Sequence, residues 1–359
     1  MNRFGIRFCF STFGESHGKA IGCLIDGVPA GLKIDEEFIQ GELDRRKPGQ
    51  NEYATARKEA DKVEILSGVF EGMSTGTPIA MVIYNTNQKS KDYSDIKDVF
   101  RPGHADFTYW HKYGIRDYRG GGRSSARETA ARVAAGAVAK LMLKPLGIEL
   151  ESGIVQIAGI EAKELDFSYA PTSEIYALDA GVEQAQKDAV LEAKNLHDSV
   201  GGVAQVRITN LPAGLGEPLY YKLDGVLADA MMGINAVKAV EIGDGFESAS
   251  AFGSTNNDPI RSNGFESNHA GGILGGISNG EEVRLNVYFK PTPSIFMQQH
   301  TVTSNNKEVD FALKGRHDPC VAIRGSVVAE AMAALVVADM VLLNMGRTMK
   351  GLTEYYTHG

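Results

Sequence analysis

Three short motifs occur twice in this chain, and they occur in the same order both times. They are PAGL at 29–32 and 212–215, a VEI segment at 63–65 and 240–242 that precedes a glycine and Phe-Glu, and G-[MI]-S-x-G at 72–76 and 276–280. One repeated motif can arise by chance, but three in register indicate a duplicated unit. We therefore expect a single domain over residues 1–359, with pseudo-repeats at about 1–160 and 203–359 joined by a polar connector at 161–202.

Hydrophobic periodicity predicts an α+β fold. Period-two alternation and apolar runs bounded by turn residues predict strands at 4–13, 20–28, 63–72, 78–85, 203–210 and 282–289. Helices are expected at 35–46, from 126 to the Lys144-Pro145 pair, at 182–196, in a segment reaching Val237, and at 327–343. Because strands come in runs and helices are few, mainly antiparallel sheets are favoured over a doubly wound parallel sheet.

A glycine loop flanked by arginines leads into a long alanine-rich segment. The glycines at 120–122 let the backbone approach a ligand closely, and Ser125-x-x-Glu128 is a capping box that would start a helix. The first turn of that helix would point unpaired N–H groups and the guanidinium groups of Arg123 and Arg127 toward one place. We expect a phosphate or carboxylate to bind there. The alternative is that the serine is only a cap and the arginines only solvate a surface.

The charge of the chain narrows the classes of ligand. A net charge of −8 argues against a general nucleic-acid binder or a protein of anionic membrane surfaces. The apolar segment at 331–345 is too short to span a bilayer and carries Asp339, so we expect a core helix. Three cysteines without C-x-x-C spacing and histidines without an H-x-x-x-H pair predict a reduced, cytoplasmic protein with no metal site. Arginines beside Gly or Pro turns then indicate a local cationic pocket, and they are Arg45, Arg46, Arg101, Arg119, Arg123, Arg127 and Arg316.

The segment GESHG at 14–18 allows more than one interpretation. It matches the nucleophile elbow G-x-S-x-G with Ser16 as the nucleophile, which leaves a serine hydrolase as an alternative. That elbow needs a helix after the serine, whereas residues 20–28 are expected to form a strand. His17 in this segment and His104 in RPGHAD are each suited to passing a proton near neutral pH, or to filling a loop. If the two halves face each other, these loops would meet in one pocket.

Long segments spread over nearly the whole chain resemble the chorismate synthase family. They are TFGESHG, DGVPAG, LDRRKPG, RPGHADFTY, YRGGGRSSARET, NAVKAVEIGDGF, SNHAGGILGGISNG, KPTPS and GRHDPC. Several such motifs in the family's order are far more specific than any one glycine pattern. The resemblance implies anti-1,4-elimination of phosphate from 5-enolpyruvylshikimate 3-phosphate, which gives chorismate and needs reduced FMN without net redox change. It also implies a homotetramer whose subunits are β-α-β sandwiches.

The same resemblance implies roles for individual residues. His17 would protonate the leaving phosphate, His104 would serve the flavin, and Asp318 would help flavin N5 to take the substrate proton. Ser16 and Ser125 would hold these groups in place. Flavin contacts would come from Arg123, Ser124, Ser125, Asn235, Ala236, Gly275, Lys290, Pro291, Thr292, Pro293, Ser294 and Arg316. Substrate contacts are expected from Arg45, Arg101 and Arg127.

The source of reducing equivalents is a separate expectation. Arg46 matches a position that the family assigns to NADPH, but Glu52 stands where the family often has a second arginine. We therefore expect NADPH to act only indirectly, with a separate flavin reductase as partner. A non-catalytic flavin- or phosphate-binding protein is the alternative function, and a serine hydrolase that uses Ser16 is a third.

Overall fold

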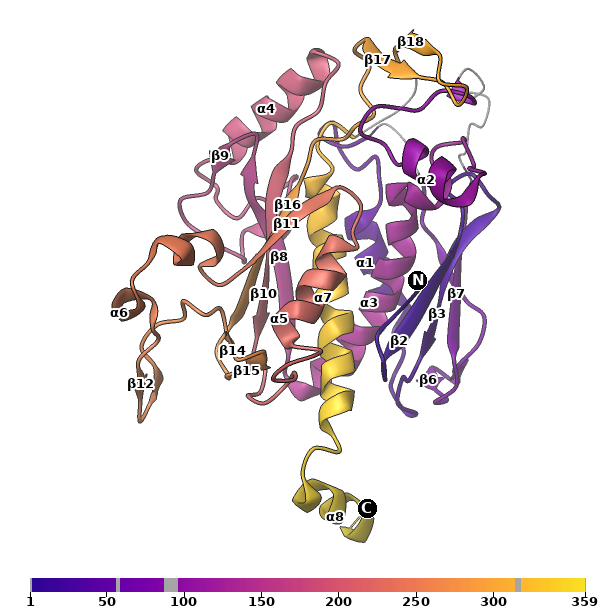
Figure 1. The fold of residues 1–359 in the computed structure, drawn as a ribbon. Helices are drawn as coiled ribbons and strands as arrows, with labels where there is room; N and C mark the ends of the chain where they lie inside the picture. The colour runs from indigo at the N-terminus through magenta and orange to yellow at the C-terminus, as the bar shows by residue number, and fades with distance from the viewer. Residues whose placement is uncertain (1, 56–58, 87–95, 314–317, 359) are drawn as a thin grey trace.

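Two five-stranded sheets form the outer layers of the fold, and helices fill the space between them (Figure 1). The computed structural model describes residues 2–55, 59–86, 96–313 and 318–358. The first sheet has the order β1 (Arg3–Phe4), β2 (Cys9–Gly14), β3 (Ala20–Asp26), β7 (Ile79–Tyr84), β4 (Val63–Ile65). The second has the order β11 (Val237–Ile242), β16 (Val283–Phe289), β10 (Gly202–Thr209), β8 (Glu149–Ile157), β9 (Ile160–Glu161). Neighbouring strands in both sheets are antiparallel, which confirms the predicted α+β sandwich.

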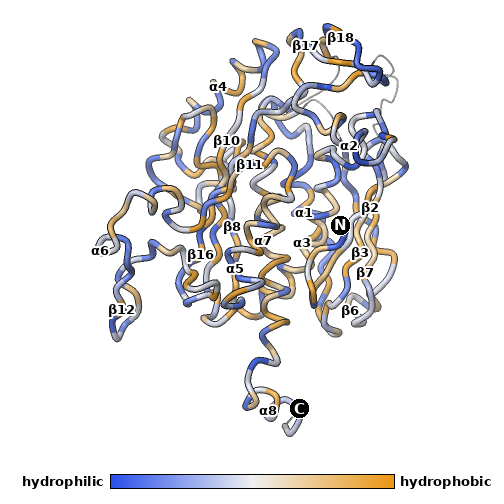
Figure 2. Tube along the Cα trace, viewed as in Figure 1, coloured by the Kyte–Doolittle hydropathy of each residue, from blue (hydrophilic) through white to orange (hydrophobic). Residues whose placement is uncertain are grey.

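The central layer consists of α1 (Glu36–Arg46), α3 (Thr129–Leu143), α5 (Leu223–Met232) and α7 (Ala322–Asn344). α3 packs on the first sheet, α7 packs on the second, and the two helices pack on each other. Apolar residues run along both helices in Figure 2. α7 is long and apolar enough to cross a membrane, but 83% of its most apolar window is buried inside the protein. It is the core helix that the sequence predicts for this segment.

α3 and α7 come very close together where Gly136 faces Ala331. A Cβ atom added to Gly136 would lie 2.6 Å from the Cβ of Ala331, so only glycine permits this spacing. Both helices begin at the same end of the molecule, near α2 (Asp106–Tyr113) in Figure 1. The first turns of the two longest core helices therefore lie at one end of the sandwich.

Shorter elements surround these layers. The hairpins are β5 (Val69–Phe70) with β6 (Met73–Ser74), β12 (Ile260–Arg261) with β13 (Gly264–Phe265), β14 (Ile273–Leu274) with β15 (Ile277–Ser278), and β17 (Gln299–Val302) with β18 (Glu308–Phe311). The remaining α-helices in the described part of the chain are α4 (Glu183–Asn195), α6 (Gly253–Asn256) and α8 (Met349–His358). The β12–β13 hairpin and α8 extend away from the body of the molecule (Figure 1).

The two PAGL turns make the same hydrogen bonds. In the first turn, the Ser74 hydroxyl donates to the Pro29 carbonyl (2.6 Å) and accepts from the N–H of the turn's leucine (2.9 Å). In the second turn, Ser278 donates to the Pro212 carbonyl (2.6 Å) and accepts from the corresponding leucine N–H (2.9 Å). In both halves, the serine of the G-[MI]-S-x-G motif therefore joins the two ends of the PAGL turn.

The order of the strands repeats as well. The run β2-β3-β7-β4 in the first sheet corresponds to β8-β10-β16-β11 in the second. The helices follow corresponding strands along the chain. α1 comes after β3 and α5 after β10, while α3 comes after β7 and α7 after β16. β8 lies within the expected bounds of the first repeat, at about 1–160, but it pairs with β10 in the second sheet. Duplication of an ancestral unit stays a prediction.

The start of α3 differs from the prediction. A 3₁₀ turn at Ala126–Glu128 precedes the helix, which begins at Thr129. The Ser125 hydroxyl accepts from the N–H of Arg127 (3.3 Å), whereas the side chain of Glu128 binds Arg132 (2.7 Å). The expected capping box is therefore only half formed, because the glutamate has a stronger partner in the next turn of the helix.

Two other helices have different ends from those expected. α5 ends at Met232 rather than at Val237, because Val237 pairs with Phe289 as the first residue of β11. α7 begins at Ala322, ahead of the expected start at residue 327. The start of α7 also packs on the second sheet, since a Cβ added to Gly202 of β10 would lie 2.9 Å from the Cβ of Ala322.

Candidate active site

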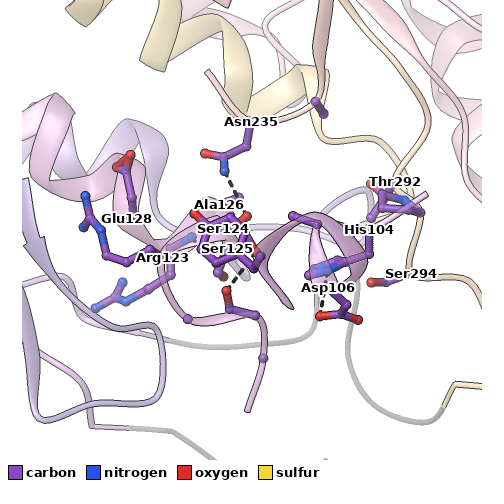
Figure 3. Close-up of a pocket in the computed structure, with 18 of the residues that line it drawn as sticks. His104, Asp106, Arg123, Ser124, Ser125, Ala126, Glu128, Asn235, Thr292 and Ser294 are labelled. Atoms are coloured by element: carbon purple, nitrogen blue, oxygen red, sulfur yellow. Dashed lines mark hydrogen bonds and ion pairs between the residues drawn. The ribbon is translucent and has the colours of Figure 1, made fainter. Parts of the chain in front are cut away.

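A cavity of about 1110 Å³ opens at the end of the sandwich where α3 and α7 begin (Figure 3). Its walls come from the GESHG loop, the RPGHAD loop, the glycine loop, the first turns of α3 and α7, and residues 233–236 and 290–294. These segments are far apart in the sequence and belong to both halves of the chain. Their convergence is the arrangement that the motif pattern predicts.

The glycine loop at 120–122 makes room for three side chains. All three glycines have positive φ (62°, 98° and 54°), a conformation that other residues rarely adopt. A Cβ on the first would lie 2.1 Å from Cε1 of His17, on the second 2.9 Å from Cε1 of His104, and on the third 2.4 Å from Oε2 of Glu15. The loop thus brings the imidazoles of both predicted histidines and one carboxylate against the same stretch of backbone.

A buried carboxylate joins two arginines below the loop. The Asp61 side chain is fully buried, accepts from Arg46 (3.0 Å), and forms an ion pair with Arg127. Arg46 also donates to the Thr129 hydroxyl (3.2 Å) and to the Ala126 carbonyl (2.8 Å). The Nη2 atom of Arg127 is buried and has no hydrogen-bond partner within the described residues. One guanidinium N–H at the cavity wall is therefore left for a ligand.

A second ion pair lines the cavity at the start of α7. Asp318 pairs with Arg324, and its other oxygen accepts from the N–H of Thr55 (3.1 Å). The buried Nε of Arg324 has no partner in the part of the chain that the structure describes. Burial lowers the pKa of the Arg46 guanidinium, and the nearby Arg324 and Arg127 lower it further, while Asp61 offsets part of this effect. Three guanidinium groups thus share two carboxylates, and an anion bound here would balance the excess positive charge.

A third cluster holds His104. Asp106, the first residue of α2, accepts from Arg101 (2.7 and 2.9 Å) and from Arg116 (3.2 Å). Its Oδ1 also lies 3.1 Å from Nδ1 of His104. Burial alone would raise the pKa of Asp106, but the hydrogen bonds from Arg101 and His104 hold it well below its usual range. Burial lowers the pKa of His104, so the imidazole is mainly neutral near pH 7.

The opposite wall offers polar atoms without partners. Asn235 donates to the Ser124 carbonyl (2.9 Å), as Figure 3 shows, while its Oδ1 is buried with no partner among the described residues. The hydroxyl of Thr292 is likewise buried and has no hydrogen-bond partner among the described residues. Lys290 donates to the Gly103 carbonyl (2.7 Å), which closes this wall against the RPGHAD loop. Unfilled donors and acceptors around a cavity of this size suit a large polar ligand.

Most of the residues singled out in the sequence line this cavity. They are His17, Arg46, Arg101, His104, Arg123, Ser124, Ser125, Arg127, Asn235, Ala236, Lys290, Thr292, Pro293, Ser294 and Asp318. Ser16 lies directly behind His17, with its Oγ 3.1 Å from Nδ1 of the ring. β3 follows this serine, so the strand–turn–helix arrangement of a hydrolase elbow is absent at this position. Arg316 lies outside the described residues.

Besides Ser16, three predicted residues in the described part of the chain do not line the cavity. Gly275 lies in the turn between β14 and β15, at the opposite end of the second sheet in Figure 1. Pro291 stiffens the 290–294 segment without facing the cavity. Arg45 points to the other side of α1, where it pairs with Glu330 (2.8 Å) in a cluster with Glu42 and Lys140. The structure thus places Arg45 in a buried ion-pair network between core helices.

Sequence reasoning missed several residues of the site. Asp61, Asp106 and Arg116 each complete a cluster of charges, yet nothing local marks Asp61, whose partners are 15 and 66 residues away. Arg324 carried a usable signal, because it is a cation at the start of an otherwise apolar helix. Asp106 ends the RPGHAD motif, and the arginine that begins this motif donates to its carboxylate.

Comparison with known proteins gives a consistent result. The family model described as chorismate synthase matches residues 8–342. A protein of Sulfurimonas denitrificans named chorismate synthase is 75% identical over 99% of both chains. One of Nitratiruptor sp. with the same name is 70% identical over 99% of this chain and 100% of the relative. A crystal structure of chorismate synthase superposes with a TM-score of 0.77 at 34% identity and covers 99% of each chain.

Proposed function

The chain belongs to the chorismate synthase family, and we propose that its cavity performs the family's reaction through the charge clusters described above. The reaction is the anti-1,4-elimination of phosphate and a C6 proton from 5-enolpyruvylshikimate 3-phosphate. The chain is accordingly an enzyme, a carbon–oxygen lyase of aromatic biosynthesis. The observation that carries the proposal is a pair of buried arginines, Arg127 and Arg324, whose N–H groups are unfilled within the described residues, in a cavity lined by the buried His17 and the partly buried His104.

The arginines support binding of the substrate's anionic groups. Arg127 and Arg324 each present a buried N–H without a partner among the described residues. Phosphate and carboxylate oxygens are the acceptors that guanidinium groups bind most strongly. Negative charge grows on the phosphate oxygen as its bond to carbon breaks, so fixed positive groups stabilise the transition state more than the bound substrate. Arg101 lies on the same wall, held by Asp106.

The fit of reduced FMN rests on the opposite wall. The unfilled Oδ1 of Asn235 and the hydroxyl of Thr292 suit a flat heterocycle with polar edges, and Arg123 and Lys290 suit its phosphate. The other contacts would come from Ser124, Ser125, Ala236, Pro293 and Ser294, which line the same cavity. When bound, reduced flavin would supply electron density for loss of the phosphate, with no net redox change.

Three side chains would move or hold protons. His17 would protonate the leaving phosphate, because it is buried beside the glycine loop with Ser16 against its Nδ1 (3.1 Å). Asp318, oriented by Arg324 and the Thr55 N–H, would assist removal of the C6 proton. His104 would serve the flavin from the glycine loop. Replacing His104 with Ala should lower turnover by roughly a hundredfold while flavin still binds, as for a lost proton-transfer group.

Assembly and supply of reductant complete the proposal. We further propose a cytoplasmic homotetramer, whose contacts would cover large apolar side chains that are exposed in one subunit, such as Tyr220 (90% exposed) and, on α8, Tyr356 (80% exposed). Arg46 is only 1% exposed, and its guanidinium binds Asp61, Thr129 and Ala126, which leaves little for NADPH to contact. A separate flavin reductase would therefore supply reduced FMN, with NADPH acting only through that enzyme.

One experiment separates this proposal from its alternatives. The protein is incubated without oxygen, with dithionite-reduced FMN and 5-enolpyruvylshikimate 3-phosphate, and chorismate absorbance and free phosphate are recorded. Equal amounts of both products are expected, and no product would leave a non-catalytic binder. An esterase would hydrolyse ester substrates without FMN and lose this activity in Ser16→Ala. Aerobic turnover with oxidised FMN and NADPH as sole reductant would contradict the separate reductase.

A further inference from the structure

Asn85 is the first residue after β7, and its side chain contacts both the GESHG loop and Arg127. β7 pairs with β3, and Tyr84 at its end lies opposite Ala20. The backbone N–H of Asn85 then donates to the Lys19 carbonyl (3.0 Å), which continues this pairing by one step. The register of the first sheet therefore brings Asn85 to the loop that precedes β3.

The amide nitrogen of Asn85 closes the turn that carries His17. Nδ2 donates to the carbonyls of Glu15 (3.0 Å) and Gly18 (3.0 Å), the first and last residues of this turn. Within the turn, the Gly18 N–H donates to the Glu15 carbonyl (3.0 Å). One NH₂ group thus holds both ends of a four-residue turn, and the imidazole in the middle of it is buried.

The amide oxygen of Asn85 holds Arg127. Oδ1 accepts from Nε of Arg127 (3.0 Å), and Asp61 forms an ion pair with Nη1. A guanidinium group is planar and rigid, so two fixed nitrogens also fix the third. The third nitrogen, Nη2, is buried and has no partner among the described residues. Asn85 and Asp61 together therefore decide where this N–H group points at the cavity wall.

The partners of the Asn85 amide allow it only one orientation. In the flipped orientation, Oδ1 would face two carbonyl oxygens, and the NH₂ group would face a guanidinium N–H that cannot accept. Both contacts would be repulsive. An aspartate at this position would keep an acceptor for Arg127 but would have no N–H for the turn. The donor and the acceptor of one short side chain are thus both used.

We propose that Asn85 is a positioning residue that joins the His17 turn to the Arg127 guanidinium, so that the proton donor and the anion-binding N–H group keep a fixed separation. Asn85 acts through these two groups and is not itself one of the residues that line the cavity. On the proposed function, Arg127 would bind the phosphate while His17 protonates its leaving oxygen. An error of about 1 Å in such an arrangement can lower a rate roughly a hundredfold. Only this effect on turnover rests on the proposed function, because the joined geometry is a property of the protein alone.

The first test is the steady-state kinetics of Asn85→Ala with chemically reduced FMN and without oxygen. The variant releases the turn and the guanidinium together, so we expect kcat to fall roughly tenfold to a hundredfold and KM to rise. Gln186→Ala is the matched control, because the buried Gln186 amide on α4 also donates to two backbone carbonyls, those of Val155 (3.3 Å) and Ile160 (3.0 Å), outside the cavity. The control should keep the wild-type kcat. A kcat for Asn85→Ala within about threefold of the control would overturn the proposal.

A double-mutant cycle distinguishes joining from a general loss of structure. Asn85→Ala, Arg127→Ala and the double variant are compared in kcat/KM. Once the guanidinium is absent, one of the two joined groups is gone, so removal of Asn85 should lower kcat/KM by a much smaller factor than in the wild type. Equal factors in the two backgrounds, in folded proteins, would contradict the joining role.

Asn85→Asp tests the turn separately, and it also serves if Asn85→Ala does not fold. The new carboxylate keeps an oxygen for Nε of Arg127 and sets its second oxygen against the carbonyls of Glu15 and Gly18. A crystal structure should show this turn displaced from its wild-type position while the guanidinium stays in place, and kcat should fall as in Asn85→Ala. An unmoved turn would overturn the proposal. If the turn moves but the wild-type protein makes no chorismate, the proposed function fails and the role of Asn85 in the geometry remains.

Discussion

Gly120→Ala should inactivate the enzyme without unfolding it. The added Cβ would lie 2.1 Å from Cε1 of His17, whereas two carbon atoms in contact need about 3.5 Å. The imidazole must therefore move by roughly 1.4 Å, which is the difference between these distances. A displacement of about 1 Å in a reacting group can lower a rate roughly a hundredfold. We expect kcat to fall at least a hundredfold.

Backbone strain provides the control for this prediction. Gly120 has φ of +62°, and alanine in this region costs about 1–2 kcal/mol of folding free energy. Gly147 has a similar φ of +74°, but no atom lies within 4 Å of an added Cβ. Gly147→Ala should therefore lose a similar amount of stability in urea unfolding and keep its turnover. Both variants are assayed with chemically reduced FMN, without oxygen, by phosphate release. A Gly120→Ala enzyme within about threefold of Gly147→Ala would refute the reasoning.

Three further outcomes are expected from the charge clusters and the repeated turns. Arg45→Ala should lower the free energy of unfolding by roughly 2 kcal/mol. This is less than the cost of breaking a buried ion pair completely, because Lys140 remains beside Glu330. The KM for the substrate should not change. Arg127→Ala should instead raise that KM at least roughly tenfold. Steady-state kinetics test both assignments, because an unchanged KM in Arg127→Ala or a raised KM in Arg45→Ala would contradict them. Burial raises the pKa of Glu330, but its cationic partners lower this pKa well below the value of about 4.3 in the unfolded chain. The ionised carboxylate therefore stabilises the fold fully above about pH 4.3, and this stabilisation is lost as the pH falls further. The urea midpoint should consequently drop more steeply below about pH 5 in the wild type than in Glu330→Gln, and parallel curves would exclude this carboxylate as the cause. Ser74→Ala and Ser278→Ala should each cost about 1–3 kcal/mol, and very different unfolding free energies would show that the two turns are not equivalent.

Local sequence patterns predicted much of the layer structure. The alternation at 283–289 gives β16, whose alternate residues are buried, and the polar amphipathic segment at 182–196 gives α4 almost to the residue. The predicted end of α5 is wrong, because the position of this end depends on a strand partner far away in the chain. Ala236 takes a positive φ of 70° there, and the next residue pairs with Phe289. Apolar periodicity carries no information about such a pairing.

The site was predictable where a loop sequence limits the backbone. Three consecutive glycines and the histidine motifs were identifiable, and the structure brings them together. The direction of a long side chain was not predictable. Arg45 and Arg46 are neighbours in one motif, but a step of one residue on a helix turns the side chain by about 100°, so one faces the cavity wall and the other faces Glu330. Asp61 was missed because its importance comes only from the two arginines that meet it.

The contact between Gly136 and Ala331 has a consequence for how ligands enter. At this point only the methyl group of Ala331 separates the two helices, so α3 and α7 pack as one block, and the first turn of each lines the cavity. Widening the cavity by separating these helices would open a void through the centre of the core. Entry and release of substrate must then depend on rim segments such as the 290–294 turn and α2, so crowding this rim should slow exchange while leaving the chemical step intact.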